Sequence, residues 1–160
     1  MQPLRDPRPT PDLKICGITD PEQAQAIAQM GVQAIGVIGV PATPRFVEPA
    51  QRRALFQLLE QQHPQLHRVW VVADPDDAAL EEALNGAGQP SVVQLHGSES
   101  NEHCQSLKQR YPGQQWWKAL RVREPDDLKQ LEQYAPHVDA LLLDAWSADQ
   151  LGGTGHRIPL

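Results

Sequence analysis

Residues 13–22 read LKICGITDPE, and this stretch joins a short buried strand to a helix start. Leu13–Cys16 is apolar apart from one lysine, a composition typical of parallel strands that are covered on both faces. Asp20 can cap a helix whose first turn contains Pro21, where the missing proline N–H has no helical partner to lose. The stretch therefore predicts a strand, a loop and a helix in that order, which is the unit of a parallel α/β fold.

The same alternation of apolar run, polar loop and amphipathic stretch repeats along the chain. The predicted strands end about 25 residues apart, the length of one βα unit. Helices are predicted between them, with a second proline-marked start at Glu124-Pro125-Asp126. The expected fold class is α/β, a TIM-type (β/α)8 barrel of which about six βα units are present. After Leu13–Cys16, the predicted strands are Ala34–Val40, Arg68–Ala73, Ser91–Leu95, Trp116–Leu120 and Ala140–Leu143.

The length of the chain favours one domain. Residues 1–12 are rich in proline and contain no apolar core, so we expect a flexible N-terminal leader. Residues 13–160 are expected to form a single barrel domain. Only residues 144–160 follow the last predicted strand, whereas two more units would need about 50 residues at this spacing. We therefore expect a barrel that is truncated at its C-terminus.

Charge and cysteine content restrict the classes of partner. The 160 residues contain 14 Lys and Arg against 20 Asp and Glu, a formal net charge of -6, which argues against binding to nucleic acid or anionic membranes. The longest apolar runs are about five or six residues, too short for the ~20-residue helix that spans a bilayer. The two cysteines, Cys16 and Cys104, are too few for a disulfide scaffold, which favours a cytoplasmic location. Cys104 lies within a predicted helix and is expected to pack in the core.

Reactive or charged side chains follow the predicted strands at the point where each strand ends. Parallel α/β proteins bind ligands at this edge, so the series indicates a site. The alternative is that these loops contain only the turn and capping residues that any loop requires. The series is Cys16-Gly17, Arg45, Asp74, His96-Gly97, Arg121 and Asp144.

Cys16 and Asp144 form the candidate catalytic pair. A thiol can act as a base if the site stabilises its thiolate, and Gly17 permits a ligand to approach the backbone closely. A carboxyl group at the end of the buried strand Leu141–Leu143 can donate a proton. The alternatives are an inert buried cysteine and an aspartate that caps a helix or forms an ion pair.

Three further features are candidates for ligand binding. Arg45 lies in a proline-containing loop that would fix its guanidinium for a carboxylate or phosphate, although a solvated surface arginine is the alternative. His96 could be a ligand, a catalytic group or a loop hydrogen bonder. The glycine-rich loop at residues 152–155 could hold an anion or act as a lid. A metal site of Cys16, His96 and Asp144 matches no standard zinc pattern and is disfavoured.

Six short motifs, in this order, resemble those of the phosphoribosylanthranilate isomerase family. Together they extend from about Leu13 to Leu160, and several independent motifs in one order are a specific signal. They are Lys14-Ile15-Cys16-Gly17-Ile18-Thr19, Pro44-Arg45-Phe46-Val47, Val93-Gln94-Leu95-His96-Gly97, Lys118-Ala119-Leu120-Arg121, Leu142-Leu143-Asp144 and Gly152-Gly153-Thr154-Gly155.

The resemblance implies an isomerase of tryptophan biosynthesis whose small-molecule substrate is a phosphosugar. It would convert N-(5-phosphoribosyl)anthranilate, an aminoaldose, into the aminoketose 1-(2-carboxyphenylamino)-1-deoxyribulose 5-phosphate. In the family scheme, the Asp144 position holds the general acid that opens the ribose ring, and the Cys16 position holds the general base that removes the C2 proton. Arg45 would hold the anthranilate carboxylate, and the loop with Gly153 and Gly155 would close over the substrate. His96 is a further substrate-binding candidate, and no metal or organic cofactor is implied.

The resemblance also implies two further strands, whose glycine-containing turns bind the substrate phosphate in the family. The sequence ends before either strand. One alternative is therefore an inactive partial barrel, a fragment or assembly module that pairs with a complementary C-terminal segment or associates with itself. A second alternative is another phosphosugar barrel enzyme, because such barrels share loop positions across many reactions.

Overall fold

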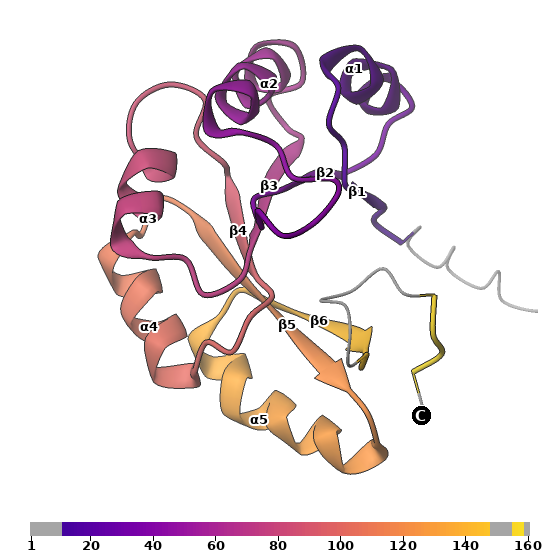
Figure 1. The fold of residues 1–160 in the computed structure, drawn as a ribbon, viewed down its shortest axis with the longest axis vertical. Coiled ribbons are helices and arrows are strands. Elements are labelled where there is room, and N and C mark those ends of the chain that lie inside the picture. Colours follow the sequence, from indigo (N-terminus) through magenta and orange to yellow (C-terminus); the bar gives the residue numbers. More distant parts are fainter. Residues whose placement is uncertain (1–10, 148–154, 159–160) are drawn as a thin grey trace, which may run out of the picture.

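The computed structural model describes residues 11–147 and 155–158. Within these ranges, six strands form one sheet in the order β1-β2-β3-β4-β5-β6, and each neighbouring pair is parallel (Figure 1). The predicted α/β class and all of the predicted strands are confirmed. The strands are β1 Lys14–Cys16, β2 Ala34–Ile38, β3 His67–Val72, β4 Val92–Leu95, β5 Gln115–Val122 and β6 Ala140–Ala145.

Helices connect successive strands and lie along the outside of the curved sheet (Figure 1). The predicted helix start at Asp20 is confirmed, because its Oδ1 accepts a hydrogen bond of 2.9 Å from the Gln23 N–H. The start at Glu124 is confirmed in position, but the first turns form a 3-10 helix. The α-helices are α1 Pro21–Gln29, α2 Pro49–Gln62, α3 Asp77–Leu84, α4 Asn101–Arg110 and α5 Gln130–Tyr134, and the 3-10 helices are η1 Pro125–Lys129 and η2 Ala135–His137.

Three strand ends, those of β2, β5 and β6, differ from the predicted ones by two residues, and the other differences are of one residue. β2 ends at Ile38, two residues early, because the backbone turns past an indole: a Cβ at Gly39 would lie 2.1 Å from Trp70 Nε1. β5 extends beyond Leu120 because it pairs with β6 as far as Val122 opposite Ala145. Tertiary contacts, which local composition does not encode, set these strand ends.

Alternate strand residues face two separate apolar clusters. In β3, Trp70 and Val72 belong to the large cluster covered by the helices, whereas Val69 and Val71 face the inner side of the sheet. Cys104 of α4 is fully buried in the large cluster, as predicted, and burial raises the pKa of its thiol to about 11. The inner cluster consists of Ala34, Val69, Val71 and Val92, with Cys16, Ile38 and Trp117 packed against it.

The predicted leader, residues 1–12, lies outside the described ranges apart from Pro11 and Asp12, which are exposed and belong to no helix or strand. Of the glycine-rich loop, only Gly155 is described. Among the described residues, no helix is long and apolar enough to cross a membrane.

Candidate active site

The carboxyl ends of the strands bring the predicted site residues to one edge of the sheet. Cys16, the last residue of β1, packs against the inner cluster. Leu95 at the end of β4 faces the helices, so the alternation of side chains turns the following His96 towards the inner face. Asp144 lies in β6 opposite Arg121 of β5.

His96 and Asp144 contact each other directly. The distance from His96 Nε2 to Asp144 Oδ2 is 3.1 Å, and the side chains are 13% and 27% exposed. The His96 backbone N–H donates to the Val72 carbonyl at 2.7 Å, which extends the pairing of β4 with β3 by one residue. Burial lowers the pKa of His96; Asp144 opposes this effect, and the positive charges of Arg121 and Lys118 reinforce it. The imidazole is therefore mainly neutral at pH 7, and its contact with Asp144 is a hydrogen bond.

Arg45 lies against Cys16 and Gly17. Its Nη1 donates to the Cys16 carbonyl at 3.5 Å, a long hydrogen bond. Gly17 has a φ of +80°, and a Cβ at this position would lie 2.2 Å from Arg45 Nη1, so only a glycine leaves room for the guanidinium. A second glycine, Gly36 of β2, lies under the Cys16 thiol, because a Cβ there would be 2.8 Å from Sγ. Arg45 itself remains exposed and can receive an anionic ligand.

The structure groups the predicted residues in two pairs. It brings Arg45 to Cys16 at β1 and His96 to Asp144 at β6, and these are the two outer strands of the described sheet. No hydrogen bond joins Cys16 to Asp144 within the described ranges. Gly155 is exposed with a φ of +71°, and Gly153 lies outside the described residues. The described part of the chain contains no group of three or more His, Cys, Asp or Glu side chains that could hold a metal ion.

The sequence and the fold match one family of proteins. The family model for N-(5'phosphoribosyl)anthranilate (PRA) isomerase matches residues 13–159. The chain belongs to this family. The curated PRA isomerase of Gloeobacter violaceus is 46% identical over 146 residues, which are 91% of this chain and 64% of that protein.

Solved PRA isomerases have the same arrangement of strands and helices over part of their length. The enzyme from Thermotoga maritima is 28% identical with a TM-score of 0.75, over 88% of this chain and 64% of that chain. A second PRA isomerase structure, in complex with reduced 1-(o-carboxyphenylamino)-1-deoxyribulose 5-phosphate, is 28% identical with a TM-score of 0.72, over 85% of this chain and 66% of that chain. The chain thus spans about two thirds of the length of these relatives.

The sequence assigned no role to three polar residues near this edge, although two of them, Gln94 and Lys118, lie in the quoted motifs. Gln94 is 4% exposed, and its Oε1 accepts no hydrogen bond from any described residue, although β4 is otherwise apolar. A polar residue inside an apolar strand could have marked it as a site residue. Lys118 and Glu99 form a buried ion pair next to the His96 loop. Their partnership is hard to predict, because 19 residues separate them in the chain.

Proposed function

We propose that this chain supplies the acid, the base and the carboxylate-binding side chain of a PRA isomerase. The reaction is the conversion of N-(5-phosphoribosyl)anthranilate into 1-(2-carboxyphenylamino)-1-deoxyribulose 5-phosphate. The observation that carries the proposal is the contact of His96 with Asp144 at the same edge of the sheet as Cys16 and Arg45. Membership of the family supports this reaction over those of other phosphosugar barrels.

Asp144 acts as the general acid. Its protonated carboxyl group gives a proton to the ribose ring oxygen, the bond from that oxygen to C1 breaks, and the lone pair on the anthranilate nitrogen forms the C1=N bond of a protonated Schiff base. His96, at 3.1 Å, orients the carboxyl group. A neutral imidazole suits this task because it can donate to the carboxylate or accept from the carboxylic acid.

Cys16 acts as the general base through its thiolate. The thiolate removes the proton from C2, the electrons of that bond form a C1=C2 double bond, and the positive nitrogen becomes neutral. The resulting enolamine gains a proton at C1 and loses its C2 hydroxyl proton, which gives the aminoketose. Gly36 leaves space for the thiol on the inner side of the sheet.

Arg45 binds the anthranilate carboxylate. Because its guanidinium lies beside Cys16, a carboxylate bound there would hold the anthranilate end of the substrate next to the thiol. The two cysteines form no disulfide, which fits a reducing cytoplasm as the place of action.

The test is the loss of PRA fluorescence with the purified 160-residue protein. We expect activity that falls at least about 100-fold in Cys16→Ser and in Asp144→Asn, the usual size of a lost acid or base. Cys104→Ser, at a thiol buried among the helices that none of the proposed steps uses, is the matched control and should retain activity. Isomerase activity that survives both site substitutions would overturn the proposed roles.

The outer strands support a second element of the proposal, a macromolecular partner. Within the described residues, β1 and β6 each pair with one strand only. We expect these edges to pair with a complementary C-terminal segment or with a second copy of the chain. If the protein is inactive by itself, the C-terminal third of the Gloeobacter relative should restore activity when it is added. Inactivity in both forms would refute the isomerase proposal.

A further inference from the structure

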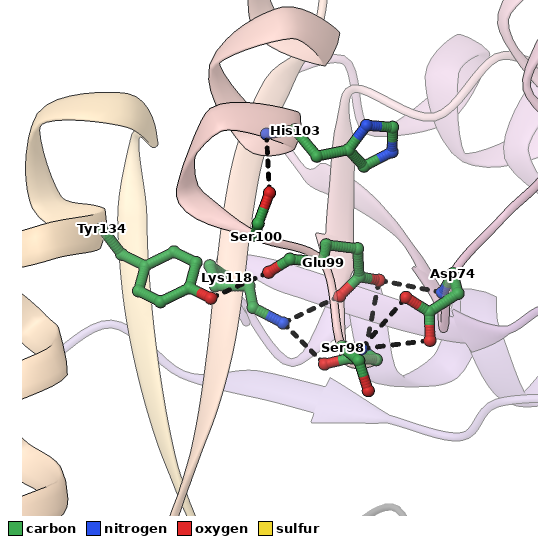
Figure 2. A network of polar contacts seen from close by, with 8 residues as sticks. Asp74, Ser98, Glu99, Ser100, His103, Lys118 and Tyr134 are labelled. Atoms are coloured by element: carbon green, nitrogen blue, oxygen red, sulfur yellow. Dashed lines mark hydrogen bonds and ion pairs between the residues drawn. The ribbon is translucent and has the colours of Figure 1, made fainter.

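A buried ion pair, drawn in Figure 2, contacts Gly97, the residue after His96, and none of the proposed catalytic steps uses it. Lys118 of β5 contacts Glu99, which precedes α4, with 2.8 Å between Nζ and Oε2. The two side chains are 2% and 0% exposed. Two charges are costly to bury, and apolar residues of similar size often stabilise a fold equally well, so stability alone does not explain this pair.

The pair connects two loops at the carboxyl edge of the sheet. Lys118 Nζ also donates to the Gly97 carbonyl at 2.8 Å. The second carboxylate oxygen of Glu99 accepts from the backbone N–H groups of Asp74, at 2.9 Å, and Gly97, at 3.2 Å. Both backbone polar groups of Gly97 are thereby fixed by buried charges.

Asp74, in the loop after β3, holds the loop of Gly97 and Ser98 by further hydrogen bonds. It is the one non-glycine residue with a positive φ, +47°, among those described, and both of its carboxylate oxygens accept from the Ser98 N–H, at 3.0 and 3.1 Å. A Cβ at Gly97 would lie 2.4 Å from Asp74 Oδ2, so the two loops are in close contact. The strained backbone of Asp74 is thus retained within a hydrogen-bonded network.

Tyr134 of α5 attaches the network to the helix layer. Its hydroxyl donates to the Glu99 carbonyl at 2.9 Å, and Lys118 Nζ lies 5.9 Å from the centre of its ring (Figure 2). Elements from β3 to α5 therefore meet at the Lys118–Glu99 pair. The residue immediately before the doubly held Gly97 is His96.

We propose that Lys118 and Glu99 are positioning residues, which fix Gly97 and thereby hold the His96 ring against Asp144. This inference deepens the proposed isomerase function and rests on it for its catalytic meaning. The contact it concerns can nevertheless be measured without substrate. A failure of the inference and a failure of the isomerase proposal are therefore distinguishable.

Glu99→Gln is the direct test, because glutamine has the same shape but one acceptor oxygen. Either Lys118 or the two backbone N–H groups must lose their partner. The readout is the coupling of His96 to Asp144, measured as the shift that Asp144→Asn causes in the NMR titration of the His96 ring. The ring signal is assigned by its loss in His96→Gln. Asp144 raises the pKa of His96, so Asp144→Asn lowers that pKa in the parent protein.

We expect the shift that Asp144→Asn causes in the His96 pKa to be less than about half as large in Glu99→Gln as in the parent protein. Residues that lose contact lose their coupling. Arg121 and Lys118 also lower the pKa of His96. Their effect is the same with and without Asp144→Asn in a given background, so it cancels in the shift. An unchanged shift would overturn the proposal. If Glu99→Gln does not fold, the apolar pair Lys118→Met with Glu99→Leu replaces it and is judged by the same two outcomes.

Asp139→Asn is the matched control. Asp139 also shares its oxygens between a lysine and a backbone N–H, those of Lys108 and Trp116, each at 2.8 Å. It lies at the opposite ends of the strands from His96, just before β6 begins. Replacement of the Asp139 carboxylate by an amide should leave unchanged the shift that Asp144→Asn causes in the His96 pKa. A shift that falls equally in Asp139→Asn would mean that general loss of stability, rather than positioning, is responsible.

Discussion

The two cysteines differ in environment and should differ in reactivity. Cys104 is fully buried and its pKa is raised to about 11 by that burial, so it has little thiolate at neutral pH. Cys16 is only partly buried. We expect a thiol reagent such as DTNB to modify one cysteine of the native protein and two after denaturation. Rapid modification of native Cys16→Ser protein would contradict this assignment.

His96 should make stability depend on pH. Its pKa is lower in the folded protein than in the unfolded chain, where it is about 6.5. The imidazole of the unfolded chain therefore binds a proton more readily than that of the folded protein. The stabilisation from His96 that is present above pH 6.5 is lost as the pH falls through the pKa of His96 in the folded protein. We expect the free energy of unfolding of the parent to decrease between pH 7 and 5 by more than that of His96→Gln, measured by urea denaturation. His103→Gln, at an exposed position of α4, should behave like the parent.

Substitutions at Gly17 and Gly31 distinguish the effect of the Arg45 contact from the effect of backbone strain. Both have φ near +80°, but a Cβ at Gly31 would have no atom within 4 Å, whereas one at Gly17 would overlap the guanidinium. Gly31→Ala should lower the free energy of unfolding by about 1 kcal/mol. Gly17→Ala should lower the free energy of unfolding by more than Gly31→Ala does. It should also weaken binding of the anthranilate carboxylate, because the new methyl group displaces Arg45. Equal effects of the two substitutions on stability and on binding would refute the contact.

The sequence indicated which residues lie at the ends of strands, but not which of them touch. Cys16, His96 and Asp144 could be placed at one edge because parallel strands share their direction. The contact of Asp144 with His96, rather than with Cys16, follows from the sheet order and curvature, which depend on all strands together. Nothing near Glu99 in the sequence indicates that Lys118 is its partner, so the pair becomes visible only in the fold.

Helices α2 and α3 are joined by one carboxylate. Glu82 of α3 accepts from both Arg52 and Arg53 of α2, and Arg52 is almost fully buried. Although burial opposes the effect, these two arginines hold the pKa of Glu82 below its usual value. The buried Arg52 would lose its ionic partner if this carboxylate were removed.

We therefore expect Glu82→Gln to lower the free energy of unfolding by about 1–2 kcal/mol, since it weakens hydrogen bonds between charged groups. Glu81→Gln on the same helix, where the side chain forms an exposed 3.5 Å pair with Arg110, should change it by less than about 0.5 kcal/mol. Thermal or urea unfolding of the two variants gives the comparison. Equal losses would show that the joint between α2 and α3 contributes no more than a surface pair.

The strands and the helix starts were predictable, but the 3-10 geometry of η1 was not. Glu124-Pro125 marks the start correctly, as Asp20-Pro21 does for α1. At η1 the Asp127 carboxylate accepts the Arg123 and Glu124 N–H groups at 2.7 and 3.0 Å, whereas at α1 the capping carboxylate belongs to Asp20, the residue before the helix. This arrangement depends on where β5 ends, which is decided by its pairing with β6.

The order of strands in the sheet predicts a gradient of protection across the fold. Strands β2 to β5 each pair on both sides, whereas β1 and β6 pair on one side within the described residues. When no partner is paired with the edges of the sheet, we expect backbone amides of β3 and β4 to exchange slowest with deuterium, and those of β1 and β6 to exchange fastest among the strands. Hydrogen exchange followed by NMR measures this directly. Protection of β1 and β6 equal to that of β3 would mean that their outer edges are paired in solution.

The six described strands lie side by side in the sheet in the same order in which the ribosome synthesises them. Each described strand after β1 pairs with the strand that left the ribosome just before it, so these six strands can pair in the order of their synthesis. Each new βα unit can dock on a sheet that is already in place, and the growing edge moves forward with translation. β6, the last of the six described strands to be synthesised, carries Asp144, so the acid of the proposed site follows the histidine that orients it.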